Sequence, residues 1–94
     1  MMINEFLNYL KYERNRSGLT IKNYGEDLRA FKEFYGNLEG CHSWKSVDSD
    51  IIRDWMESMM DKGNNATSIN RRLSALRSFY HFALARKLVD KDPV

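Results

Sequence analysis

The only proline of this 94-residue chain is Pro93, and this feature narrows the possible folds most. Proline interrupts helices because its ring clashes with the preceding turn and removes a backbone donor. Everything before Pro93 can therefore form unbroken helices, and no run of alternating β-branched residues predicts a strand. The sequence predicts an all-α fold.

Glycine and clusters of polar residues divide the chain into four predicted helices. These helices cover roughly residues 3–14, 20–35, 48–63 and 67–87. The predicted N-caps are Thr20, Asp48 and either Thr67 or Ser68, because short polar side chains accept hydrogen bonds from the first free amides. Gly63 is the predicted stop of the third helix, and residues 36–46 are predicted as loop.

Apolar side chains recur at helical spacing and predict one shared core. The predicted core positions are Phe6, Leu7 and Leu10; Tyr24, Leu28, Phe31 and Tyr35; Ile51, Ile52, Trp55, Met56 and Met59; and Ile69, Leu73, Leu76, Tyr80 and Ala83, with Phe79 and Leu84 at its margins. A chain of this length supports one small domain, and 43% hydrophobic residues are enough to drive its folding by burial.

Charge is distributed unevenly along the chain. Residues 66–87 carry five basic residues and no acidic one, whereas all but two of the 13 acidic residues precede Lys62. A solvated helix gains stability from mixed charges three or four residues apart, so a segment without acids indicates an external anion. Chance variation in a short chain is the alternative explanation.

The face of the fourth helix that lies opposite its predicted core carries short polar side chains and arginines. Its members are Thr67, Asn70, Arg71, Ser74, Arg77, Ser78 and His81. Little bulk, several donors and positive charge are what a helix needs to approach a DNA duplex closely. Lys22 and Asn23 give the start of the second helix a smaller surface of this kind, beside Arg16.

Residue types that would indicate catalysis or a cofactor are not grouped in this sequence. Cys41 and His42 have no second Cys/His pair to complete a metal site. Tyr24, Tyr35 and Tyr80 fall on predicted core positions, and His81 has no nucleophile at a fixed helical offset. We therefore predict no catalytic residue, no metal, no cofactor and no small-molecule substrate.

No apolar run approaches the roughly 20 residues that span a bilayer, and no signal peptide opens the chain, so a cytoplasmic protein without a membrane partner is expected.

Three segments in order resemble a known family: "FLNYLKYERNRSGLTIKNYGEDLRAFKEF", "TSINRRLSALRSFYHFA" and "LVDKDPV". They are similar to the core-binding domain of the tyrosine recombinases, the phage integrase and Xer type of site-specific recombinase. Asp-Pro replaces the usual Asn-Pro at the end. The resemblance implies a SAM-like, four-helix orthogonal bundle in which residues 1–94 are a single core-binding domain. Residues 88–94 would begin a linker to a catalytic domain outside this chain.

The resemblance also implies a function. The second and fourth helices of such domains cross the DNA major groove, and the chemistry belongs to a separate C-terminal domain, so this chain is not expected to be an enzyme by itself. The positions that match family DNA contacts are Lys22, Asn23, Thr67, Ser68, Asn70, Arg71 and Ser74; Arg77 is a further phosphate candidate. Arg71 is the leading candidate for a base or phosphate contact, whereas for Arg72 an intramolecular pairing is equally expected.

The implied partners are duplex DNA at a recombination site and sister recombinase subunits, which assemble as a tetramer in the full-length form. The implied location is the bacterial cytoplasm, associated with the nucleoid when DNA is bound. Two alternatives stay open: a helical protein-interaction module that meets an acidic partner, and, with less support, a small stand-alone enzyme.

Overall fold

The structure is a computed structural model that describes residues 2–36 and 43–94. These residues form α1 (Met2–Tyr12), α2 (Gly18–Gly36), the short 3-10 helix η1 (Trp44–Ser46), α3 (Ser49–Asp61) and α4 (Ala66–Ala85). The prediction of an all-α chain with four main helices is confirmed. Cys41 and His42 lie outside the described residues, so the expectation that they form no metal site is not tested.

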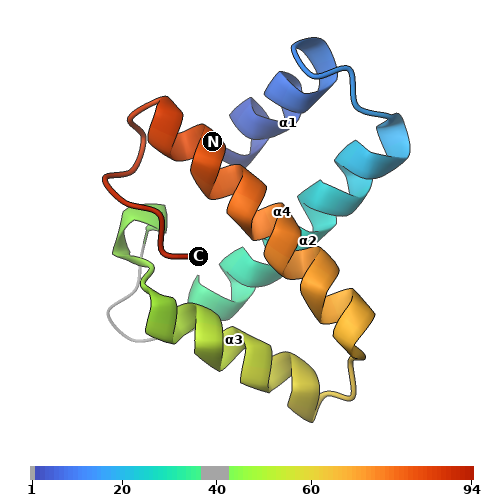
Figure 1. Cartoon of the computed structure of the whole chain (residues 1–94), viewed down its shortest axis with the longest axis vertical. Coiled ribbons are helices and arrows are strands. Elements are labelled where there is room, and N and C mark those ends of the chain that lie inside the picture. Colours follow the sequence, from blue (N-terminus) through green and yellow to red (C-terminus); the bar gives the residue numbers. More distant parts are fainter. Residues whose placement is uncertain (1, 37–42) are drawn as a thin grey trace.

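Figure 1 shows that α4 crosses α2 near the middle of both helices. α1 packs against both of them on one side of the crossing, and α3 packs against both on the other side. Helices that cross in this way form an orthogonal bundle, as predicted. The crossing leaves the first half of α2 and the first half of α4 on the same side of the molecule, the right-hand side in Figure 1.

The starts of α2, α3 and α4 are each fixed by a side chain that accepts a hydrogen bond from an otherwise free amide. The predicted cap Asp48 is confirmed, because its Oδ1 accepts from the Ile51 amide at 3.0 Å. The predicted caps Thr20, Thr67 and Ser68 are wrong. Ser17 accepts from the Thr20 amide at 3.2 Å, and Asn65 accepts from the Ser68 amide at 2.9 Å, so both helices begin earlier than predicted.

The end of α3 is fixed by Gly63, as predicted. Its φ of +86° lies in the left-handed region that glycine adopts without a steric penalty. The Gly63 amide donates to the Met60 carbonyl at 3.0 Å and the Asn64 amide donates to the Met59 carbonyl at 3.1 Å. These bonds satisfy carbonyls of the last turn and turn the chain toward α4.

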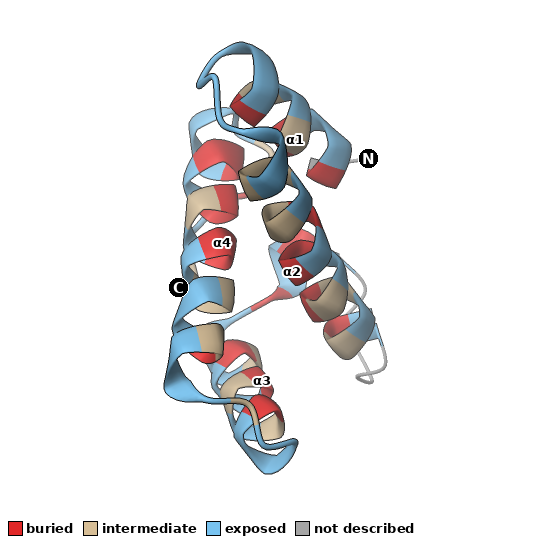
Figure 2. Cartoon of the chain, turned by 90° about the vertical axis from the view of Figure 1, so that its right-hand side faces the viewer, coloured by how far each residue is buried: buried red, intermediate tan, exposed pale blue. Residues whose placement is uncertain are grey.

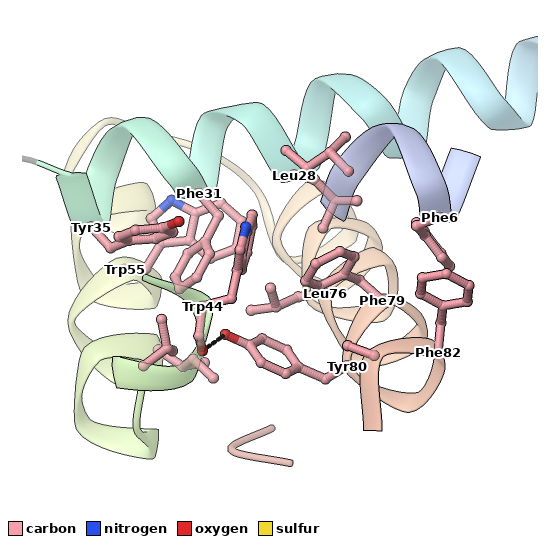
Figure 3. Packing of buried hydrophobic residues seen from close by; sticks show 14 of the residues in the cluster. Phe6, Leu28, Phe31, Tyr35, Trp44, Trp55, Leu76, Phe79, Tyr80 and Phe82 are labelled. Carbon is pink, nitrogen blue, oxygen red and sulfur yellow. Dashed lines mark hydrogen bonds between the residues drawn. The ribbon is translucent and has the colours of Figure 1, made fainter. Parts of the chain in front are cut away.

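The centre of the core is aromatic, and one of its members comes from the predicted loop. Trp44 of η1 is buried, with its ring centroid 4.4 Å from that of Phe79. The Tyr80 hydroxyl donates to the Trp44 carbonyl at 2.8 Å, as the dashed line in Figure 3 shows. The prediction of structureless loop is therefore wrong for residues 44–46, because a buried tryptophan holds this short helix against α4.

The buried surface of α4 is wider than predicted. Phe79 is fully buried and Phe82 is buried as well, whereas Leu84 is exposed. The cause is α1, whose Phe6 ring packs 5.6 Å from the Phe79 ring and 5.4 Å from the Phe82 ring. Figure 2 shows the buried side of α4 turned toward α1 and α2, and an exposed side turned away from them. That exposed side carries the candidate site.

Candidate nucleic-acid interface

A strip of exposed polar residues runs along the outer side of α4. We call it the α4 strip, and it consists of Thr67, Asn70, Arg71, Ser74 and Arg77, all of which are exposed. Residues three, four and seven apart share one face of a helix, so these side chains form one surface. Ser68, which was predicted with them, is only half-exposed, and its amide is bound by the cap Asn65.

The start of α2 contributes the two remaining predicted residues. Lys22 is exposed and Asn23 is half-buried, and both lie in the first half of the helix. Because the first halves of α2 and α4 diverge from their crossing toward the same side, these residues and the N-terminal end of the α4 strip belong to one side of the molecule (Figure 1). The fold thus places on one side of the molecule two segments that are more than 40 residues apart in sequence.

A buried carboxylate lies where α2 meets α4. Asp27 of α2 is 2% exposed, and its Oδ1 accepts a hydrogen bond from Arg71 Nη2 at 2.9 Å. Arg72 Nε lies 3.7 Å from the same oxygen. Among the described residues, Asp27 Oδ2 has no hydrogen-bond partner. One carboxylate therefore faces two guanidinium groups, and this cluster keeps a net positive charge.

This pairing changes the interpretation of Arg71. The sequence predicted an outward-facing arginine, with intramolecular pairing considered for Arg72; the structure pairs both with Asp27, and Arg71 makes the shorter contact. Half of the Arg71 side chain nevertheless stays exposed. A guanidinium has five donors, so one bond to Asp27 leaves others free and restricts the direction in which they point.

Segment 66–87 lacks acids of its own, but other segments supply them. Besides the pair with Asp27, Arg86 Nη2 lies 2.8 Å from Glu13 Oε2, and His81 Nε2 lies 3.2 Å from Asp92 Oδ2. The segment has no charge pairs three or four residues apart within itself, as its sequence indicates, but contacts with other segments engage Arg71, His81 and Arg86. Arg77 and Lys22, in contrast, have no ion pair within the part of the chain that the structure describes.

The Asp27 and Arg71 pair should couple the stability of α2 and α4. We expect Arg71→Ala to lower the free energy of unfolding by about 1–3 kcal/mol, because it leaves a buried carboxylate with one distant partner. The range stays below that of a fully buried pair, because solvent screens the exposed half of Arg71. In an Asp27→Asn background the same change should cost little. A double-mutant cycle by urea unfolding measures this coupling; additivity within about 0.3 kcal/mol would contradict it.

The three tyrosines that the sequence assigns to the core lie in or against it. Tyr35 and Tyr80 are buried, as predicted, and Tyr24 packs half-buried against the same core. Within residues 2–36 and 43–94, no three His, Cys, Asp or Glu side chains are placed to hold a metal ion. None of the described helices is long and apolar enough to cross a membrane.

Comparisons with known proteins agree on one family. The family model described as "Phage integrase, N-terminal SAM-like domain" matches residues 3–87. The chain is 34% identical over 91 residues to the tyrosine recombinase XerD of Halalkalibacterium halodurans. This match covers 97% of the chain and 30% of that relative. It is 38% identical over 92 residues to the tyrosine recombinase XerC of Pediococcus pentosaceus. This match covers 98% of the chain and 31% of that relative.

A similar match is found with the tyrosine recombinase XerC of Bacillus pumilus, at 35% identity over 92 residues. In each case the chain spans about 30% of the length of its relative. No solved structure matches the chain.

Proposed function

Because the chain belongs to the family of phage integrase N-terminal SAM-like domains, we propose that it binds duplex DNA as the core-binding part of a site-specific tyrosine recombinase. The observation that carries this proposal is the α4 strip. It is exposed and polar and contains two arginines, and its N-terminal end lies on the same side of the bundle as the first half of α2, which contains Lys22 and Asn23. Such a surface combines the phosphate charge and the groove contacts that a duplex offers.

The proposed contacts divide into two kinds. Lys22 and Arg77 contact phosphates, because they are exposed cations without a partner among the described residues. Thr67, Ser68, Asn70 and Ser74 lie on the first turns of α4 and approach base edges or the backbone of the major groove, and Asn23 approaches it from α2.

The charge of Arg71 suits a phosphate contact, and its position on the α4 strip suits a base contact. Its bond to Asp27 limits its conformations before DNA arrives, which favours a fixed, directional contact over a mobile phosphate contact. On a binding site selected from a random pool, Arg71→Ala is then expected to weaken binding more than on random duplex. Equal losses on both would assign Arg71 to the backbone.

The activity of the longer parent is part of the proposal. Strand cleavage and rejoining would reside in the part of a recombinase that this chain does not span, and this chain would supply binding without catalysis. Sister subunits would assemble with it on DNA as a tetramer, in the bacterial cytoplasm and, when bound, at the nucleoid. Residues 88–94 would lead into the linker between the two parts.

The test is a titration of the chain with random-sequence duplex at several salt concentrations. Binding is expected to be weak and to fall with salt, by roughly 0.9 in the log-log slope for each phosphate contact. Absence of binding at every low salt concentration would refute the proposal. Polyglutamate serves as the control, and equal affinity for it would favour the alternative of a module that meets an acidic protein partner.

A further inference from the structure

A pocket of about 290 Å³ opens between α1, the connection of residues 13–17, the first turns of α2 and the second half of α4. Phe6 and Tyr24 contribute aromatic surface to it, and Ser78 and His81 of α4 line one side. Arg14 and Arg16 line it from the connection between α1 and α2. Side chains that donate hydrogen bonds therefore surround the aromatic surface of the pocket.

This pocket differs in charge from two other pockets on the surface of the described residues. No acidic residue lines it, whereas a second pocket contains Glu5 and Glu13 and a third contains Glu33. Arg14 and Arg16 are exposed and have no ion pair within the described part of the chain. Arg86, which also lines the pocket, pairs with Glu13, and His81 pairs with Asp92. The two unpaired arginines thus give the pocket a net positive charge, which suits an anion.

The pocket continues the α4 strip. Ser78 and His81 follow Ser74 by four and seven residues, so they lie on the same face of α4. From Thr67 to His81 this face extends over about 21 Å at 1.5 Å per residue. The major groove of DNA is only about 12 Å wide, so an α4 that crosses the groove with its first turns inside leaves the pocket outside it.

What lies beside a groove is a sugar-phosphate strand. We propose that this pocket binds the strand that borders the major groove entered by α4, with Arg14 and Arg16 as phosphate ligands. Arginine binds phosphate with two parallel hydrogen bonds, and the Ser78 hydroxyl adds a neutral donor. The aromatic surface offers a contact for the apolar face of the deoxyribose. The inference rests on the DNA binding proposed above, and it adds residues of the α1–α2 connection and of the second half of α4 to the interface.

The test compares two double variants with the parent chain on random-sequence duplex. Arg14→Ala with Arg16→Ala is expected to reduce the log-log salt slope by about 0.9 for each phosphate that is no longer bound. For affinities that are equal when extrapolated to about 1 M salt, this change in slope corresponds to an affinity that is about 8-fold lower per phosphate at about 0.1 M salt. Lys45→Ala with Arg53→Ala removes the same charge from exposed positions outside the pocket and is expected to leave the slope unchanged.

A second measurement reports on the pocket directly. The imidazole proton resonances of His81 should shift when duplex is added to the parent chain. Equal slopes for the two double variants, or an unmoved His81 resonance while DNA binds, would overturn the inference and leave the proposed function intact. Failure of the parent chain to bind duplex would overturn the proposed function first, and the titration of the parent shows this separately.

Discussion

Phe79→Ala is expected to lower the free energy of unfolding by about 3–5 kcal/mol. Phe79 is fully buried, and its ring contacts those of Phe6, Trp44 and Tyr80 at centroid distances of 5.6, 4.4 and 5.5 Å. Alanine would remove packing against α1, η1 and α4 at once and leave a cavity between them. A domain of this size has about 5–15 kcal/mol in total, so the decrease is a large part of its stability.

Thermal unfolding followed by circular dichroism measures this change. Each kcal/mol lowers the midpoint by about 4–8 °C in a domain of this size, so a fall of more than about 12 °C is expected. Leu84→Ala is the matched control, because Leu84 lies on the same helix but is 40% exposed. The control should cost about 0.5 kcal/mol or less. Similar midpoints for the two variants would show that Phe79 is not at the centre of the core.

Removing three cations of the candidate interface is expected to have the largest effect on DNA binding. On random duplex, which offers Arg71 no selected base, all three cations are expected to bind phosphates. The variant Lys22→Ala, Arg71→Ala and Arg77→Ala should therefore reduce the log-log salt slope on random duplex by about 2.7, since each phosphate that is no longer bound removes about 0.9. At about 0.1 M salt this equals an affinity decrease of about 500-fold. Fluorescence anisotropy with labelled duplex at several salt concentrations measures both quantities.

Two further variants separate direct binding from net charge and from stability. Lys11→Ala, Lys45→Ala and Arg53→Ala removes the same net charge from exposed positions elsewhere and should change the slope little. Lys22→Ala with Arg77→Ala keeps the Asp27 and Arg71 pair, so the fold is not weakened, and should reduce the slope by about 1.8. Equal losses of affinity in the two triple variants would show that Lys22, Arg71 and Arg77 do not mark the DNA interface.

The fold was largely predictable from the sequence because its signals are local. Helical spacing identified the four helices, and Asp48 and Gly63 marked the ends of α3 correctly. The resemblance inferred from three segments is confirmed by the family to which the chain belongs. The wrong caps show the limit: a polar stretch such as residues 64–68 offers several acceptors, and only the backbone geometry selects Asn65.

Contacts between distant segments were not predictable from local signals. Asp27 lies within a helix whose outer face has mixed charge, and nothing in its own segment indicates that it meets Arg71 44 residues later. Trp44 lies in a segment with neither helical spacing nor strand alternation, so its burial against Phe79 depends on the packing of α4. The pocket beside Ser78 and His81 likewise exists only because α1 and α4 are neighbours.

The central claim is that one side of the α2 and α4 crossing meets duplex DNA. Backbone amide chemical shifts of the chain, recorded as duplex is added, test it most directly. The largest changes are expected at Lys22 and Asn23 and along residues 67–77, with small changes in α3. Largest changes in α3, or none at α2 and α4 while binding proceeds, would contradict the claim.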